Sequence, residues 1–278
     1  MVRKSRGYCR SGMNNDSGAL TAQGAVFLKQ YGAERSGTNY LKRLIELNFP
    51  NAVVFGSVLG WKHGHYETRN GPDAECTSHA QWLESCSMGN AVYSVDGHRL
   101  PFTTAELQES IPQLHYVVST RPLASWVHGF KQFRARQRAW SSQEVESWSR
   151  RWLSAHEKWA VLLETHGGIV VEFEALIRDI SPVLEGLQSR FRLTRRHPHF
   201  VNEPRIVKAS TDSGLLFSKE HFDPKPHQNH EYKSVIPVEI HRIIESFEEE
   251  AESVLTRLRA ASCEGSREFH PKRECENE

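Results

Sequence analysis

The chain has 278 residues, of which 38% are hydrophobic and 25% are charged, a composition typical of a globular protein. Its 35 lysines and arginines and 34 aspartates and glutamates give a net charge of +1, which does not favour nucleic acid as a partner. No apolar run reaches the roughly 18–20 residues that span a bilayer, and residues 1–18 lack the apolar core of a signal peptide. We therefore expect a cytoplasmic protein without a membrane span.

The cysteines and histidines indicate neither a disulfide framework nor a metal site. The five cysteines are odd in number and widely scattered, which favours a reducing compartment. Cys76, His79 and Cys86 lie near one another, but their spacing matches no paired ligand set, and a closed zinc site needs four ligands. We expect no metal.

The chain begins with a polar stretch that is followed by a strand, a glycine turn and a helix. Residues 1–23 are predicted to be a disordered tail, and the apolar run 25–30 predicts a buried strand. This strand leads directly into the turn 31–39. Apolar residues then recur at helical spacing over 40–47, and Pro50 lies just beyond the expected end of the helix. Strand, turn and helix in this order are typical of the start of a βαβ unit.

Further strands and helices alternate along the rest of the chain. The predicted strands are 52–59, 91–95, 115–119 and 169–172. The predicted helices are 103–110, 141–164, one that starts at Pro182, and 238–258. Alternation favours a parallel sheet with helices on both faces. We expect an α/β fold of the P-loop type, with three α/β/α layers around a central, mostly parallel sheet. Residues 24–261 form this domain, and a disordered tail follows over 262–278.

The helix predicted over 141–164 has the strongest local pattern. Ser141 and Glu144 have the spacing of a capping box. Trp148, Trp152, Trp159 and Leu163 lie roughly on one face at helical spacing, which predicts a core stripe rather than a ligand platform.

The turn after the first strand carries the residues best suited to bind an anion. Gly32 and Gly37 have the spacing of a phosphate-binding P-loop, but Thr38 follows where such loops carry lysine. Glycines let backbone N–H groups converge on phosphate oxygens, and the helix that begins near Thr38 adds the positive end of its dipole. Within the turn, Arg35 can make a bidentate contact with an oxyanion, and Ser36 supplies a hydroxyl donor.

The segment Arg35-Ser36-Gly37-Thr38-Asn39-Tyr40-Leu41 resembles a loop of the sulfotransferases that use 3′-phosphoadenosine-5′-phosphosulfate (PAPS). In that family this loop holds the 5′-phosphosulfate and opens the first helix. The resemblance implies that residues 35–40 bind PAPS as a co-substrate.

The same family has a strand that ends in Arg-Asp/Asn-Pro and a serine on the next helix, and both hold the 3′-phosphate. The segment 117–122, Val-Val-Ser-Thr-Arg-Pro, resembles this element, which implies that Arg121 binds that phosphate. One residue between arginine and proline is missing here. The serine register is therefore open: Ser125 comes early, and His128 sits nearer the expected place.

Two more segments resemble sulfotransferases. Residues 170–176, Val-Val-Glu-Phe-Glu-Ala-Leu, are similar to a strand and Tyr-Glu-Asp-Leu segment late in the family's domain. Residues 60–64, Gly-Trp-Lys-His-Gly, look like a Trp-Lys-His motif of a less-studied branch. Together the resemblances imply a sulfotransferase that moves a sulfuryl group from PAPS to a hydroxyl or amine acceptor.

Two histidines are candidates for the base that takes the proton of the acceptor. Lys62-His63 follows the strand after the first helix, where carbohydrate sulfotransferases tend to carry their base. His98 lies in His-Arg-Leu-Pro, which looks like the Thr-His-Leu-Pro motif of cytosolic sulfotransferases. We expect His63, with Lys62 beside it, and keep His98 as the alternative. The basic stretch 194–235 is either a lid over the nucleotide or a solvated linker.

Two other functions remain open. A P-loop kinase would use Asp96, after the predicted strand 91–95, to hold a metal, but the Gly-Lys-Ser/Thr of such enzymes is missing. A non-catalytic nucleotide-fold module that binds a protein or a glycan is the other possibility, because Arg121-Pro122 matches the family imperfectly.

Overall fold

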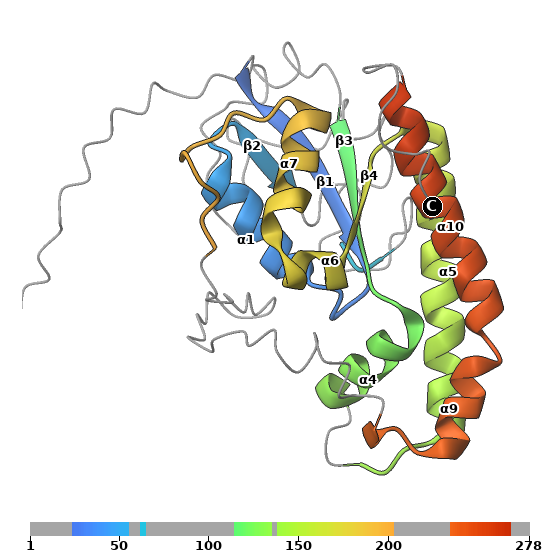
Figure 1. The fold of residues 1–278 in the computed structure, drawn as a ribbon. Coiled ribbons are helices and arrows are strands. Elements are labelled where there is room, and N and C mark those ends of the chain that lie inside the picture. Colours follow the sequence, from blue (N-terminus) through green and yellow to red (C-terminus); the bar gives the residue numbers. More distant parts are fainter. Residues whose placement is uncertain (1–23, 56–61, 65–113, 135–137, 203–233, 268–278) are drawn as a thin grey trace, which may run out of the picture.

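The computed structural model describes the fold over residues 24–55, 62–64, 114–134, 138–202 and 234–267. Within these ranges, the centre of the fold is a parallel sheet of four strands in the order β2-β1-β3-β4 (Figure 1). The strands are β1 (Val26–Gly32), β2 (Ala52–Phe55), β3 (Leu114–Thr120) and β4 (Ile169–Glu172). Gly32 at the end of β1 lies opposite Ser119 of β3, and Thr120 lies opposite Glu172 of β4. The predicted α/β class with a parallel central sheet is confirmed.

Helices cover both faces of this sheet (Figure 1). One face carries α1 (Thr38–Asn48), α6 (Phe173–Arg178) and α7 (Ile180–Phe191). The other carries α4 (Leu123–Arg134), α5 (Ser142–His166), α9 (Val238–Glu245) and α10 (Glu248–Arg267). In Figure 1, α5 and α10 lie side by side. Among the described helices, none combines the length and apolarity needed to cross a membrane.

The alternation of side chains along the strands gives the sheet a separate core on each face. Leu28 of β1 and Val117 of β3 pack with Leu44 of α1, and all three are fully buried. Phe27 and Tyr31 of β1 belong to the core on the opposite face, under α5 and α10. Burial of such a side chain contributes about 1.5–3 kcal/mol, so the two cores hold β1 and β3 firmly from both sides.

The pattern read for the long helix is confirmed in α5. Ser141 is its N-cap and accepts a hydrogen bond from the backbone N of Glu144 at 3.4 Å. In the predicted stripe, Trp152, Trp159 and Leu163 are at most 1% exposed, and Trp148 is partly buried and packs against the same core. The shorter helix predicted from Pro182 begins earlier, at Ile180, because Asp179 caps it by accepting from the N of Ser181 at 2.9 Å.

The prediction of one continuous helix over 238–258 is wrong, since α9 ends at Glu245 and α10 begins at Glu248. At the break, the hydroxyl of Ser246 donates to the carbonyl oxygen of Ile243 at 2.7 Å. A serine that bonds back to a nearby carbonyl competes with the regular helical pattern. Phe247 belongs to the core, so the turn also brings its ring inward.

The described residues do not reach every predicted element. The strand 91–95, the helix 103–110 and the tail 1–23 lie outside them, as do residues 56–59 of the second predicted strand. Helix α10 continues to Arg267, past residue 261, where the sequence predicts the tail to begin.

The basic stretch 194–235 is described only at its two ends. At the first, the backbone N of Val201 donates to Oδ1 of Asn48 at 2.7 Å, which ties this end to α1. Residues 203–233, on which the lid hypothesis depends, lie outside the described part of the chain.

A fully buried histidine links α5 to the end of β3. Nδ1 of His156 donates to the carbonyl oxygen of Trp152 at 2.7 Å, and Nε2 accepts from the Thr120 hydroxyl at 3.0 Å. The imidazole also stacks on the Trp152 ring, with the ring centroids 3.7 Å apart. Burial lowers the pKa of His156 from 6.5 to about 3, so the ring is neutral in the folded protein.

This histidine predicts a loss of stability in acid. As the pH falls from 6.5 towards 3, the unfolded chain binds a proton at His156 that the folded chain does not bind. We expect His156→Gln to reduce the slope of the unfolding free energy against pH by up to about 1.4 kcal/mol per pH unit in this window. Urea unfolding of both proteins at several pH values measures the slope, and equal slopes would contradict the assignment.

Candidate functional site

The candidate site lies where β1 and β3 end. The chain passes from β1 to β2 on one side and returns to β3 on the other side of β1, so the winding direction reverses between β1 and β3. In open parallel sheets, ligands bind outside the carboxyl ends of the strands at such a reversal. The turn 33–37 begins at this edge and leads into α1.

The backbone of the turn requires its glycine at position 37. Arg35 and Gly37 have φ of 69° and 79°, in the left-handed region that non-glycine residues rarely adopt. A Cβ on Gly37 would also lie 2.6 Å from Cδ2 of Phe173, the first residue of α6. At Gly32 a Cβ would lie 2.6 Å from the Ser119 carbonyl oxygen, so β1 and β3 approach closely at the start of the turn.

Helix α4 fixes the outer side of the turn. The indole N–H of Trp126 donates to the carbonyl oxygen of Glu34 at 2.6 Å. The buried carboxylate of Glu34 accepts from Nη2 of Arg134 at 3.0 and 3.2 Å. The guanidinium of Arg35 lies 5.2 Å from the ring centroid of Phe133, so it extends over α4 and is exposed.

Arg121 connects the turn to the end of β3 and is only 2% exposed. Its Nε donates to Oγ of Ser125 at 2.6 Å, and its Nη1 donates to the carbonyl oxygen of Arg35 at 3.2 Å. The guanidinium also lies 4.7 Å from the ring centroid of Phe173. Arg121 and Ser125 therefore lie together, and the guanidinium is enclosed by the loop, α4 and α6.

A carboxylate is part of this cluster. Oε1 of Glu174 accepts from the Ser125 hydroxyl at 3.1 Å and lies 3.9 Å from Nε of Arg121. Oε2 of Glu174 is buried and has no hydrogen-bond partner among the described residues. Burial raises the pKa of Glu174, while the neighbouring charge of Arg121 acts in the opposite direction.

The segment 62–64 lies against the start of the turn. The backbone N of Gly32 donates to the Lys62 carbonyl oxygen at 2.9 Å, and Nδ1 of His63 donates to the Gly32 carbonyl oxygen at 2.7 Å. The indole N–H of Trp159 donates to the carbonyl oxygen of Gly64 at 3.2 Å. Nζ of Lys62 donates to Oδ1 of Asn39, in the first turn of α1. These contacts bring an ammonium group and an imidazole to the end of β1.

His63 is held in one tautomer. Because Nδ1 carries the proton donated to Gly32, the basic lone pair of the neutral ring is on Nε2. The pKa of His63 is lowered to about 3 by burial and then by the positive charge of Lys62, with smaller effects of Arg151 and Lys29. An anion bound beside these cations would raise this pKa again.

Lys29 is a site neighbour that the sequence reading missed. It lies in β1, is fully buried, and its Nζ is 4.5 Å from the ring centroid of Tyr31. Burial, and then the charge of Lys62, lower the pKa of Lys29 well below its usual value. The available signal was a lysine inside the apolar run of the first predicted strand.

The start of α1 has the electrostatics of an anion site. The helix has no side-chain cap and no acidic residue in its first turn, and Lys62 contacts Asn39 there. The N-terminal end of a helix carries a partial positive charge and attracts anions. Thr38 is buried at this end, and its carbonyl oxygen accepts from Nε2 of Gln30 at 3.0 Å.

Most of the expected site residues lie around one edge of the sheet. These are Arg35, Ser36, Gly37, Thr38, Asn39, Tyr40, Lys62, His63, Arg121 and Ser125. Ser36 is buried and donates to the Ala33 carbonyl oxygen at 2.7 Å, and the Tyr40 hydroxyl donates to Oδ1 of Asn202 at 2.9 Å. His98 lies outside the described residues.

The prediction that the chain holds no metal stays untested for the residues on which it was based. In the ranges that the structure describes, no three His, Cys, Asp or Glu side chains are grouped as metal ligands. Cys76, His79 and Cys86 lie outside these ranges.

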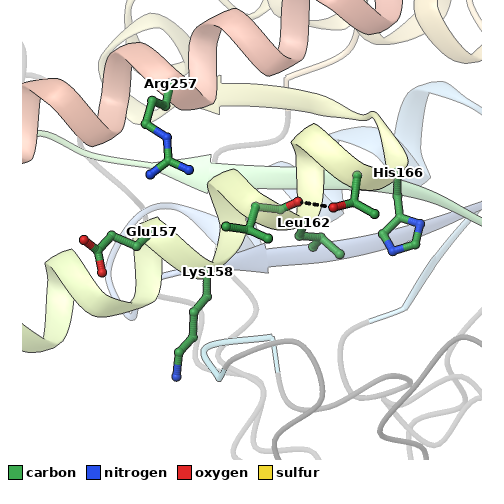
Figure 2. Close-up of a pocket in the computed structure, with 7 residues that line it drawn as sticks. Glu157, Lys158, Leu162, His166 and Arg257 are labelled. Carbon is green, nitrogen blue, oxygen red and sulfur yellow. Dashed lines mark hydrogen bonds between the residues drawn. The ribbon is translucent and has the colours of Figure 1, made fainter.

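A surface pocket elsewhere on the molecule does not involve the turn. Figure 2 shows Glu157, Lys158, Leu162 and His166 on α5 and Arg257 on α10. No residue of the turn is among the described residues that line it. This pocket is therefore separate from the turn.

Comparisons with protein-family models, with curated proteins and with solved structures returned no match.

Gly37 provides a stability test of the turn. We expect Gly37→Ala to lower the unfolding free energy by about 2 kcal/mol or more, because alanine at φ 79° is strained and its Cβ would overlap Phe173. Gly186→Ala in α7 is the matched control, since the nearest atom to its Cβ, on Ile169, is 4.0 Å away. That helical substitution should be neutral or stabilising by about 0.5–1 kcal/mol. Equal effects in urea unfolding would contradict this account.

Proposed function

We propose that this chain is a sulfotransferase that binds PAPS at the turn 32–39 and transfers its sulfuryl group to a hydroxyl or amine acceptor. The observation that carries the proposal is the start of α1, where an uncapped helix end follows a glycine turn and Lys62 contacts Asn39. This combination supplies the backbone donors and positive charge that a 5′-phosphosulfate needs. In this proposal the fold is of the P-loop type.

The cation at the turn favours sulfuryl transfer over a kinase reaction. In Gly-x4-Gly-Lys-Ser/Thr loops, the hydroxyl after lysine holds Mg²⁺. Here Asn39 occupies that position in the sequence, and its amide oxygen accepts from the ammonium group of Lys62. Lys62, which lies at the start of α1, can stabilise the negative charge that develops on the departing phosphate without a metal.

In the proposed reaction, an oxygen or nitrogen of the acceptor attacks the sulfur in line, and the sulfur–oxygen bond to the phosphate breaks. The products are the sulfated acceptor and 3′-phosphoadenosine-5′-phosphate (PAP). Nε2 of His63 takes the acceptor's proton, since Nδ1 is committed to Gly32. The negative charge of bound PAPS raises the low pKa of His63 and so makes it a better base.

Nucleotide binding is the first test. We expect PAP to bind in isothermal titration with equal affinity in EDTA and in Mg²⁺, and more tightly than ATP. Lys62→Ala should weaken PAP binding about 10-fold or more, because it removes a charge-assisted contact. Lys158→Ala removes the same charge from the exposed face of α5 and should change the affinity less than about twofold.

The outcomes separate the candidate functions. Mg²⁺-dependent binding of ATP in preference to PAP would overturn the sulfotransferase proposal in favour of a kinase. Tight PAP binding without PAP release from PAPS, across a panel of phenols, alcohols and amino sugars, would favour a non-catalytic module.

His63→Asn tests the base. The Asn amide N–H can replace Nδ1 as donor to Gly32, while the lone pair of Nε2 is lost. We expect the rate of PAP release with the best acceptor of the panel to fall about 10²–10⁴-fold, with PAP affinity within about twofold of the parent. Full activity of this variant would contradict the role of His63 and favour His98.

A further inference from the structure

The guanidinium of Arg121 already has an anionic neighbour. Oε1 of Glu174 lies 3.9 Å from Nε of Arg121 and accepts a hydrogen bond from Ser125 at 3.1 Å. A phosphate oxygen and a carboxylate oxygen use the same donors, namely guanidinium N–H groups and hydroxyls. Glu174 therefore accepts the hydrogen bond of Ser125 and places its negative charge beside Arg121, the two residues that the resemblance assigns to the 3′-phosphate of the nucleotide.

The surroundings of Arg121 limit how a second anion can reach it. The Phe173 ring lies 4.7 Å from the guanidinium, and a Cβ on Gly129 would be 2.6 Å from Nη1. Nη1 donates to the Arg35 carbonyl oxygen. A phosphate placed beside this guanidinium would also lie beside the Glu174 carboxylate, and two anions at one site repel each other.

The contact of Glu174 is nevertheless incompletely satisfied. Its Oε2 is buried without a hydrogen-bond partner among the described residues, and the geometry towards Arg121 is not bidentate. A buried acceptor without a partner costs free energy, so this contact stabilises the site less than a bidentate ion pair would. The same oxygen can accept a further hydrogen bond from a hydroxyl group of a bound nucleotide.

We propose, on the basis of the proposed function, that Glu174 sets the specificity of this site for the 3′ position of the nucleotide. Its carboxylate competes with a 3′-phosphate for Arg121 and Ser125, so a 3′-phosphorylated nucleotide binds only by displacing it. In the parent protein, a 3′-phosphate then adds little to the affinity for the nucleotide. In a variant without the Glu174 carboxylate, a 3′-phosphate increases that affinity.

The test compares PAP with AMP, which lacks the 3′-phosphate, by isothermal titration on three proteins. We expect Glu174→Gln to raise the ratio of PAP affinity to AMP affinity about 10-fold, chiefly through tighter binding of PAP. Glu172→Gln is the matched control, because Glu172 is two residues away and accepts from Nε of Arg259 at 2.7 Å. Its ratio should stay within about twofold of the parent.

A second variant, Glu174→Ala, removes the charge without leaving an amide and should change the ratio in the same direction. Thermal unfolding of each variant without ligand confirms that it is folded before titration. An unchanged ratio in both Glu174 variants, or an equal rise in Glu172→Gln, would overturn the inference while leaving the proposed function intact. Absence of binding of both nucleotides to every protein would overturn the proposed function, and the inference with it.

Discussion

A guanidinium that is removed from water must recover its lost hydration through hydrogen bonds and nearby charge. Arg121 recovers it from Ser125 in α4, from the backbone of Arg35 in the turn, and from Phe173 and Glu174 in α6. These partners come from three parts of the chain that meet at the end of β3. The shape of the turn therefore depends on Arg121 as well as on its own glycine, because Nη1 of Arg121 donates to the carbonyl oxygen of Arg35.

The charges around the turn are divided between structural pairs and the start of α1. The carboxylate of Glu34 accepts from Arg134, and that of Glu174 lies against Arg121, so both acidic groups are committed to arginines. Lys62 instead donates to an amide, which brings positive charge to the helix end. The positive electrostatic potential at the N-terminal end of α1 thus comes from the helix dipole and from Lys62, which belongs to a different segment.

Local sequence patterns predicted most helices and strands and the turn, whereas contacts between residues far apart in the sequence could not be predicted from them. Apolar runs and glycine spacing are properties of neighbouring residues, and they located β1, β3, β4, α5 and the turn at Gly32. No helix was predicted from local patterns for α4 or α6. In α4 the signal was present and was missed, because Leu123, Trp126 and Val127 recur at helical spacing. Helix α6 has only six residues, too few for such a pattern. The pairing of Glu174 with Ser125, 49 positions apart, depends on the order of the strands, which no local pattern encodes.

The position of His63 links binding to proton transfer within the proposed reaction. With a pKa of about 3, its imidazole is a weak base, because burial and the charge of Lys62 disfavour the protonated ring. A bound phosphosulfate would bring negative charge beside Lys62 and shift that pKa upwards, towards the range in which a histidine accepts protons effectively. In the proposed reaction, His63 becomes an effective base when PAPS is bound. The acceptor then loses its proton after the nucleotide has entered the site.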